Sequence, residues 1–288
     1  MPIDVKAVVG KEFEATRFEW TEKDVILYAL GLGVGVGEPQ TDPKVLQYTY
    51  ENALKVIPTF GVVPTFSCLA GAIGIPGFDV NPMMILHGEQ YLEVLASEVP
   101  TRAKVINTAK ITDVFDKGKG ALVIIEAMTK TENGEPIFRN EYSVFIRGEG
   151  GFGGEGGPPP GNEPPSRNPD ASIAYPTLTH QAIIYRLSGD YNPLHIDPQM
   201  AAMGGFEKPI LHGLCTFGNV ARAVIEAVCD NRPECFRSIK VRFAAPVYPG
   251  ETIITDMWKE SDTDVIVRAR VEERDVEVVK NAKVTIAA

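Results

Sequence analysis

Long apolar runs, cysteines and histidines are all scarce in this chain of 288 residues. No stretch is apolar over the length that a bilayer requires, so we expect no membrane span. The four cysteines form no C-x-x-C pair and are too few for a disulfide framework, so we expect reduced thiols. The four histidines show no H-x-x-x-H or H-E-x-x-H spacing, so we expect no bound metal.

Positive charge is scarce too. The 28 Lys and Arg residues stand against 38 Asp and Glu residues, which gives a formal net charge of −10. Because contacts to phosphates need clustered Lys and Arg, this balance argues against a nucleic-acid partner. The first ten residues, MPIDVKAVVG, lack the basic and apolar regions of a secretory signal, so we expect an intracellular protein.

Glycine and proline, by contrast, are concentrated in one segment. Residues 148–169 read GEGGFGGEGGPPPGNEPPSRNP, a composition that builds no packed core and is typical of a linker. No Lys-Ser or Lys-Thr pair follows these glycines, which argues against a phosphate-binding loop. The segment therefore predicts two halves, residues 1–147 and 170–288.

Both halves end in β-branched runs that are broken by turn residues, which predicts two antiparallel meanders. Asn133-Gly134, between two of these runs, is a strong hairpin signal. The expected strands are residues 89–95, 103–114, 121–129 and 137–146 in the first half, and 238–245, 252–258, 264–271 and 276–287 in the second.

A helix is expected ahead of each meander. In the second half, apolar residues recur every three or four positions from Leu214 to Val228, which predicts one buried helix face. The first half offers a shorter and weaker candidate, Pro64 to Ile73. The sequence therefore predicts an α+β fold in which two antiparallel sheets each wrap a helix.

The sequence Gly189-Asp-Tyr-Asn-Pro-Leu-His195 carries the strongest functional signal. It follows a short helical stretch, residues 182–187, and Pro193 forces Asn192 out of helical geometry, so a bent loop presents the polar side chains. An Asp and a His that share one water form a general acid/base pair. The alternative is a simple turn in which Asp190 or Asn192 bonds its own backbone, with His195 packed or solvated.

Several segments, taken together, resemble a known family. Residues 185–195, 208–218 (KPILHGLCTFG), 85–91 (ILHGEQY) and 148–154 are similar to the type 2, R-specific enoyl-CoA hydratases of the MaoC-like hot-dog group. This group includes the hydratase part of peroxisomal multifunctional enzyme type 2. The resemblance implies a double hot-dog fold, reversible hydration of trans-2-enoyl-CoA to (3R)-3-hydroxyacyl-CoA in fatty acid beta-oxidation, and no cofactor apart from the CoA of the substrate.

The resemblance also implies roles for individual residues. Asp190 and His195 match the catalytic pair, and Glu51 matches a carboxylate implicated in activity, for which we expect a structural role. The residues implied to contact the acyl-CoA are Tyr191, Pro193 and Leu194 of the loop, His87 and Gly88 of the LHGEQ motif, Lys117, and Phe243 near the pantetheine.

The chemistry of hydration assigns two further residues. Asn192 can orient the water or a substrate group through its amide. The thioester oxygen gains enolate charge, which a free backbone N–H at a helix start can stabilise. Gly213 fits that need and allows close approach, and the matching glycine of the family supplies this N–H; the alternative is simple helix punctuation.

The two halves also look like diverged copies. Aligning residues 26–30 with residues 183–187 places Gly33 opposite Asp190, Gly35 opposite Asn192 and Glu38 opposite His195. The first copy therefore lacks the three polar residues. We expect one active site per chain, in the second half, with the first half shaping the acyl-CoA pocket, its Gly-rich region 61–77 making room for an acyl tail.

Two other functions share this fold and ligand: an acyl-CoA thioesterase and a non-catalytic acyl-CoA binding module. The order Gly-Asp-x-Asn-Pro-x-His argues against the first, and an intact Asp and His argue against the second. The resemblance suggests a peroxisome, although neither end carries a targeting signal such as Ser-Lys-Leu. It leaves open a homodimer and membership of a larger multifunctional chain.

Overall fold

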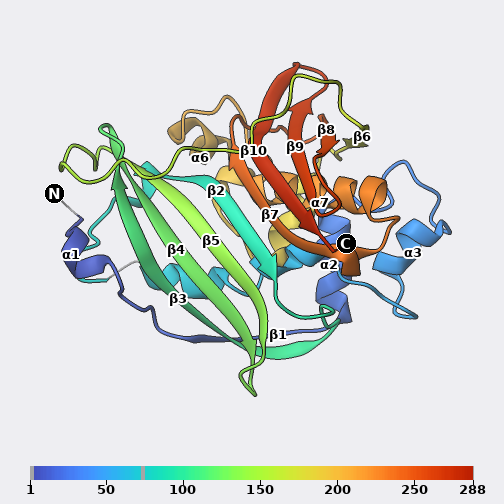
Figure 1. The fold of residues 1–288 in the computed structure, drawn as a ribbon, viewed down its shortest axis with the longest axis horizontal. Coiled ribbons are helices and arrows are strands. Elements are labelled where there is room, and N and C mark those ends of the chain that lie inside the picture. Colours follow the sequence, from blue (N-terminus) through green and yellow to red (C-terminus); the bar gives the residue numbers. More distant parts are fainter. Residues whose placement is uncertain (1–2, 73–74, 288) are drawn as a thin grey trace.

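One continuous antiparallel sheet forms the frame of the protein (Figure 1). The computed structural model describes residues 3–72 and 75–287. Within them the strand order is β1-β3-β4-β5-β2-β7-β10-β9-β8-β6. The strands are β1 (Thr16–Trp20), β2 (Ile85–Val94), β3 (Ala103–Asp116), β4 (Gly120–Thr131), β5 (Pro136–Arg147), β6 (Ala171–Pro176), β7 (Phe236–Phe243), β8 (Thr252–Lys259), β9 (Asp264–Val271) and β10 (Val276–Ile286).

The strand order shows the internal duplication. Reading inward from each edge, the first half runs β1-β3-β4-β5-β2 and the second runs β6-β8-β9-β10-β7. The two orders become identical when five is added to each strand number of the first half. The expectation of two separate sheets was wrong in one respect: β2 and β7 pair antiparallel, from Glu89 opposite Arg242 to Glu93 opposite Ser238, and merge the two sheets.

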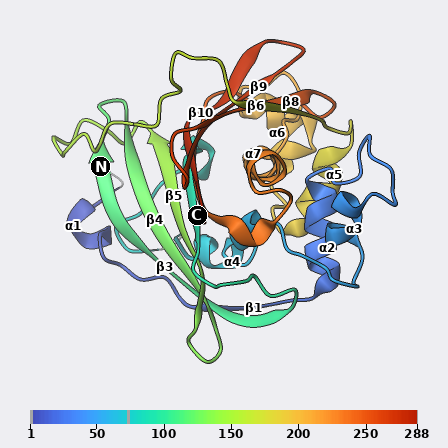
Figure 2. The ribbon, with the colours of Figure 1, turned by 45° about the vertical axis from the view of Figure 1, so that its right-hand side comes forward.

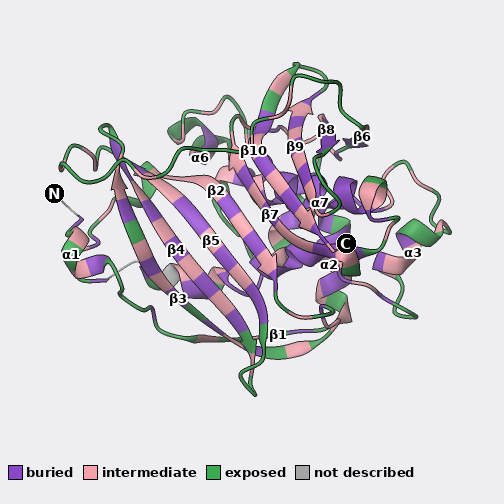
Figure 3. Ribbon diagram, in the orientation of Figure 1, coloured by how far each residue is buried: buried purple, intermediate pink, exposed green. Residues whose placement is uncertain are grey.

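The strands follow the predicted meanders, and their inner faces are buried in alternation (Figure 3). β2 begins at Ile85 instead of residue 89. The two edge strands, β1 and β6, were not predicted from the sequence; they are short and lie outside the meanders. They contain few β-branched residues, so pairing with β3 and β8 decides their conformation.

The central helix is α7 (Gly213–Val228), as predicted, and the sheet curves around it (Figure 2). It packs against four strands of its own half and against the first half's η1 (Pro58–Val62). The described residues of the first half form no comparable helix. Its expected helix 64–73 is broken into α4 (Phe66–Leu69) and η2 (Ala70–Ala72), and residue 73 lies outside the described residues.

Most of the remaining helices lie on the side of α7 that the sheet leaves open, while the N-terminal helix lies at the far end of the first half (Figure 2). The structure contains α1 (Val5–Val8), α2 (Glu22–Gly31), α3 (Pro43–Thr49), α5 (Gln181–Tyr185) and α6 (Pro198–Met203), with short 3-10 helices η3 (Pro82–Met84), η4 (Arg186–Ser188), η5 (Pro193–His195) and η6 (Pro233–Cys235). α2 and α5, the aligned helices, pack together with the Tyr28 and Tyr185 ring centroids 5.9 Å apart. No helix in the described part of the chain is long and apolar enough to cross a bilayer.

The Gly/Pro-rich segment is anchored along its path to β6. Residues 148–170, all of them described, form no helix or strand. The Asp116 carboxylate accepts hydrogen bonds from the N–H groups of Gly151 and Gly153, and Asn281 donates to the Gly161 carbonyl. These bonds hold the segment across the strand ends, although its composition favours disorder.

Gly61 shows why glycines are needed in the first half. A Cβ at this position would lie 2.6 Å from the Phe138 ring of β5 and 2.9 Å from Leu92 of β2. The small residue therefore serves close packing of η1 on the sheet, and no space for an acyl tail exists at this point.

We predict that Gly61→Ala lowers the free energy of unfolding by about 1–3 kcal/mol, because a methyl group there overpacks the core. Thermal or denaturant unfolding measures this change. Gly156→Ala is the matched control, because its Cβ would meet nothing nearer than the Asp116 carbonyl oxygen at 3.9 Å. Equal stability of both variants and the wild type would contradict the packing role.

Candidate active site

The loop after α5 bends as the sequence predicts. The helical stretch ends at Gly189, whose φ of 118° lies in the left-handed region, and η5 begins at Pro193. Asp190 Oδ1 accepts the Asn192 N–H at 3.2 Å, and Asn192 Oδ1 accepts the Leu194 N–H at 3.0 Å. The side chains of Asp190 and Asn192 therefore do bond the backbone of the loop, as the turn alternative predicts. These bonds leave Asp190 Oδ2 and the Asn192 amide nitrogen free for other partners.

Asp190 and His195 face each other across this bend. His195 Nδ1 donates a hydrogen bond to the Ile210 carbonyl at 2.9 Å, which leaves the Nε2 lone pair free. Nε2 lies 3.9 Å from Asp190 Oδ2, beyond direct hydrogen-bond distance. Burial lowers the pKa of His195, while Asp190 opposes the shift, so the imidazole is neutral at neutral pH.

A second histidine, His212, completes this cluster. Its ring stacks on His195 with the centroids 3.7 Å apart, and its Nε2 donates to the Asp190 carbonyl oxygen at 3.1 Å. Burial lowers the pKa of His212 to about 3. From the sequence, His212 was counted only among the four histidines that lack metal-ligand spacing and was given no role; the signal for one was its position directly before Gly213.

Ligand atoms of Asp190, His195 and His212 lie within 4.8 Å of one another, although the sequence has no metal-ligand spacing. Each imidazole has one nitrogen committed to a carbonyl oxygen, and the remaining lone pair lies in the ring plane. Because the rings are stacked 3.7 Å apart with their planes only 28° apart, one ion cannot lie in both ring planes at bonding distance from both nitrogens. The ring geometry therefore argues against a metal centre.

Gly213 is the first residue of α7, the 16-residue central helix. The first N–H groups of a helix have no partner within the helix, and no group among the described residues accepts a bond from the Gly213 N–H. The Phe243 ring lies 3.4 Å from where a Cβ would stand. The helix start thus offers an unpaired donor, and its glycine leaves room beside Phe243.

Two predicted contact residues join this end of the site. The His87 ring of β2 meets the edge of the Phe243 ring of β7, with centroids 5.2 Å apart. Burial lowers the pKa of His87 to about 4, and its Nε2 donates to the Glu89 carbonyl oxygen. Gly88 lies at the bulge where β2 shifts register against β5. The pairing of β2 with β7 therefore brings the two halves together beside Gly213.

The other predicted residues are more peripheral. Tyr191 is exposed, with the Arg186 guanidinium over its ring, and Pro193 is exposed while Leu194 is half-buried. Lys117, in the turn between β3 and β4, donates to the Gly156 carbonyl oxygen. Glu51 is exposed in the turn after α3, and no hydrogen bond or ion pair joins it to any described residue. These assignments stay predictions.

Comparisons with known proteins agree with the family motifs. Residues 18–148 match the MFE-2 hydratase 2 N-terminal domain, and residues 161–282 match the MaoC like domain. A Dictyostelium discoideum protein named "Probable enoyl-CoA hydratase 2" is 46% identical over 294 residues, which covers 99% of this chain and 97% of that protein. The chain belongs to the MaoC-like hydratase 2 family.

Solved structures place the fold in the same family. A MaoC-like dehydratase from Phytophthora capsici has a TM-score of 0.86 at 36% identity, and each chain is covered to 99%. Peroxisomal multifunctional enzyme type 2 from Drosophila melanogaster has a TM-score of 0.82 at 40% identity, covering 96% of this chain and 48% of that one. A Mycobacterium tuberculosis protein with a double hotdog fold matches at a TM-score of 0.57 and 10% identity, which supports the fold alone.

In this hydratase 2 family member, the second copy carries the pair Asp190 and His195, which we call the dyad. The loop of the first copy takes part in an ion pair instead. Glu38, aligned with His195, pairs with Arg222 of α7 at 2.8 Å. Arg222 also donates to the carbonyl oxygen of Gly33, the residue aligned with Asp190, at 3.2 Å. Each loop is thus tied to α7 through the carbonyl of the equivalent residue, by His212 in one copy and by Arg222 in the other.

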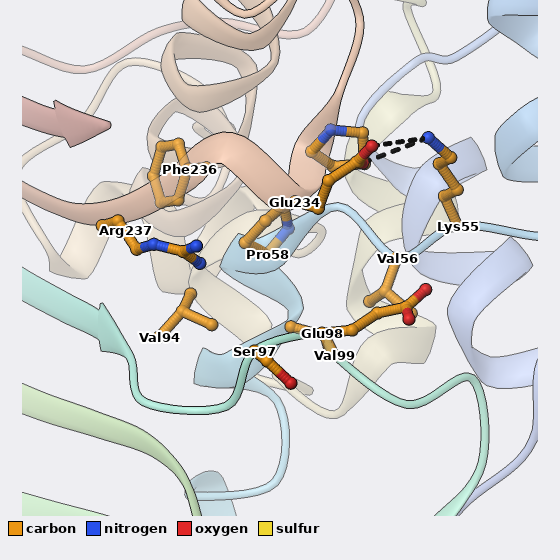
Figure 4. Close-up of a pocket in the computed structure, with 11 residues that line it drawn as sticks. Lys55, Val56, Pro58, Val94, Ser97, Glu98, Val99, Glu234, Phe236 and Arg237 are labelled. Carbon is orange, nitrogen blue, oxygen red and sulfur yellow. Dashed lines mark hydrogen bonds and ion pairs between the residues drawn. The ribbon is translucent and has the colours of Figure 1, made fainter. Parts of the chain in front are cut away.

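A separate hollow lies at the opposite end of β2 and β7 (Figure 4). Val94, the last residue of β2, and Phe236, the first of β7, line it, and the Lys55–Glu234 ion pair crosses one side. β2 is ten residues long, so this hollow is roughly 30 Å from the start of that strand. None of the predicted site residues lines it, and we assign it no part in the chemistry.

The buried, neutral histidines should make folding sensitive to acid. His212 has a folded pKa of about 3, below the ordinary value of 6.5, so between these pH values the unfolded chain binds a proton that the folded chain does not. Stability is therefore lost as the pH falls from 6.5, by about 2 kcal/mol at pH 5 for this residue. His212→Phe should show a smaller loss between pH 7 and pH 5 in denaturant titrations. An unchanged pH dependence in His212→Phe would contradict a neutral His212.

Proposed function

We propose that this chain catalyses the reversible hydration of trans-2-enoyl-CoA to (3R)-3-hydroxyacyl-CoA. Its class is that of its family, an enzyme of the enoyl-CoA hydratase 2 type and a hydro-lyase. The observation that carries the proposal is the pair of unbonded acceptors, Asp190 Oδ2 and His195 Nε2, 3.9 Å apart beside an unpaired helix N–H.

The spacing of the two acceptors suits a single water. If a water oxygen lies about 2.8 Å from each acceptor, the angle at that oxygen between the two acceptors is roughly 90°, near the angle between the two O–H bonds of water. Direct contact between the two groups would leave no place for the nucleophile. Asn192 stands at the same bend, and its amide nitrogen can orient the water or a substrate group.

The reaction then balances with one water and no other reagent. One O–H bond of the water breaks, its proton passes to the dyad, and the oxygen forms a bond to Cβ. The electron pair of the Cα=Cβ bond moves towards the thioester, whose oxygen gains charge and accepts the Gly213 N–H. The dyad returns a proton to Cα, the electron pair closes the C–H bond, and the dyad regains its starting state.

The substrate would approach along the end of the sheet that carries the dyad. Phe243 and His87 flank Gly213, so the thioester and pantetheine would lie against them. The Lys117 turn is at the same sheet end, because Ile146 pairs with both Ala121 and Ile85. Three strand spacings separate β4 from β7, or about 14 Å, a distance that a CoA tail can cover.

A thioesterase or a binding module remains the alternative, and one assay separates them. Purified protein is given crotonyl-CoA or decenoyl-CoA while enoyl absorbance and free thiol are both followed. Loss of absorbance without thiol means hydration, and release of thiol means thioester hydrolysis. Neither signal means a binding module and would overturn the proposal.

The setting of the reaction is proposed from the relatives. The Drosophila relative is a peroxisomal multifunctional enzyme, and this chain covers 48% of it. We infer a place in peroxisomal beta-oxidation, where the chain would consume an enoyl-CoA made by an acyl-CoA oxidation step. The homodimer remains a proposal.

We predict that Asp190→Asn and His195→Gln each lower kcat at least ~10²-fold, because positioned proton transfer contributes 10² to 10⁴. Asn at position 190 retains an oxygen for the Asn192 N–H, so the turn should survive and only the charge is lost. Steady-state kinetics and melting curves measure both effects, with His180→Gln as the control. Activity within a few-fold of wild type would remove that residue from the mechanism.

Lys117 should act in binding and not in chemistry, since its ammonium stands at the sheet end where the anionic tail would pass. Lys117→Ala should raise KM for acyl-CoA at least ~3-fold at low salt, with kcat largely intact. Lys119→Ala, in the same turn, is the matched control. If the two variants have the same KM as wild type, Lys117 is an ordinary turn residue that holds Gly156.

A further inference from the structure

We propose that His212 is a positioning residue for the catalytic dyad, one imidazole that holds Asp190 and His195 in register with the Gly213 N–H. The inference rests on the proposed hydratase function and deepens it. His212 lies at the junction of the loop and α7, and it contacts all three groups through different parts of the residue.

Each contact fixes a different group. The Nε2–H of His212 holds the Asp190 carbonyl oxygen at 3.1 Å, which sets where that residue begins its turn. The ring stacks on His195 at 3.7 Å and 28°, which covers one face of the catalytic imidazole. Its backbone directly precedes Gly213, and its carbonyl accepts the Cys215 N–H as the helix starts. A shift of His212 would therefore move base, acid and oxyanion donor together.

His212 is itself held rigidly. Its side chain is fully buried, and the Tyr185 ring packs beside it with centroids 4.9 Å apart. The His212 Nδ1 acceptor and the Tyr185 hydroxyl are both buried without a hydrogen-bond partner among the described groups. The hydrogen bond from Nε2–H to the Asp190 carbonyl oxygen fixes the tautomer of His212, because a carbonyl oxygen can only accept.

His212 is suited to positioning and not to proton transfer. Its low pKa keeps it neutral throughout the range where the enzyme would work, and its only N–H is committed to a backbone oxygen. The titratable groups that face His195 are Asp190 from its own loop and His212 from the residue before α7. The positive charge of Arg186, in η4, further lowers the pKa of His212. Of these two histidines, only His195 would then gain a proton as the pH falls, so His195 alone would cause the histidine-dependent loss of kcat/KM at acid pH.

Two variants separate the contacts. His212→Phe keeps an aromatic ring against His195 and loses the donor to Asp190, so kcat should fall about 10- to 100-fold with KM little changed. His212→Gln keeps a donor and loses the ring, so His195 gains access to water and its pKa should rise towards 6.5. The acid limb of kcat/KM should then move to higher pH, an effect that a merely structural residue would not produce.

The control is His180→Gln, an exposed histidine that precedes α5 and has no side-chain bond there. If both His212 variants match this control in kcat and in pH profile, His212 has no positioning role. Wild-type protein that hydrates no enoyl-CoA would instead overturn the proposed function, and the positioning role with it.

If the His212 variants do not fold, a measurement on the wild-type protein still tests the proposal. Nitrogen-15 NMR of the histidine rings should show His212 protonated at Nε2 alone and unchanged from pH 8 to pH 5. A His212 that gains a proton in this range, or that carries its proton on Nδ1, would contradict the proposal.

Discussion

The pairing of β2 with β7 is the constraint on which the site depends. Alone, each half would leave a sheet edge exposed, and an unpaired edge invites association with other chains. The Glu89 carboxylate reinforces the join, with Arg242 at 2.8 Å and Lys240 at 3.5 Å. Because the edges are paired in register, His87 of the first half reaches Phe243 of the second, and the first half forms one wall of a site whose proposed chemistry lies in the other.

Duplication also explains why one loop is reactive and the other structural. Both loops leave a helix of the α2–α5 pair, and both give a backbone carbonyl to α7. In the first copy Glu38 pairs with Arg222 of α7, which neutralises its charge. In the second copy His195 stands at the position of Glu38 and Asp190 at that of Gly33, and their side chains are 3.9 Å apart, too far to satisfy each other. The same framework therefore holds a bonded ion pair in the first copy and an unbonded acid/base pair in the second.

Sequence reasoning succeeded where the physics is local. The bend at Gly189 and Pro193 follows from backbone geometry, and the α7 face follows from apolar periodicity, so both were predictable. The merged sheet was not, because no local pattern in β2 or β7 says which edge it will meet. His212 lies directly before Gly213 in the segment KPILHGLCTFG, but its stacking on His195 was not predictable, because only tertiary packing brings the two rings together.

Burial decides the protonation states that the proposed reaction needs. The chain carries a net charge of −10, which would by itself favour protonated histidines. Yet His87, His195 and His212 all have lowered pKa values, with desolvation as the largest cause in each. The loss of water around these rings therefore outweighs the field of the whole protein. A neutral His195 is both a competent acceptor for the proton of a water and a ring that can stack on another imidazole without charge repulsion, so the burial that costs stability in acid also prepares the dyad.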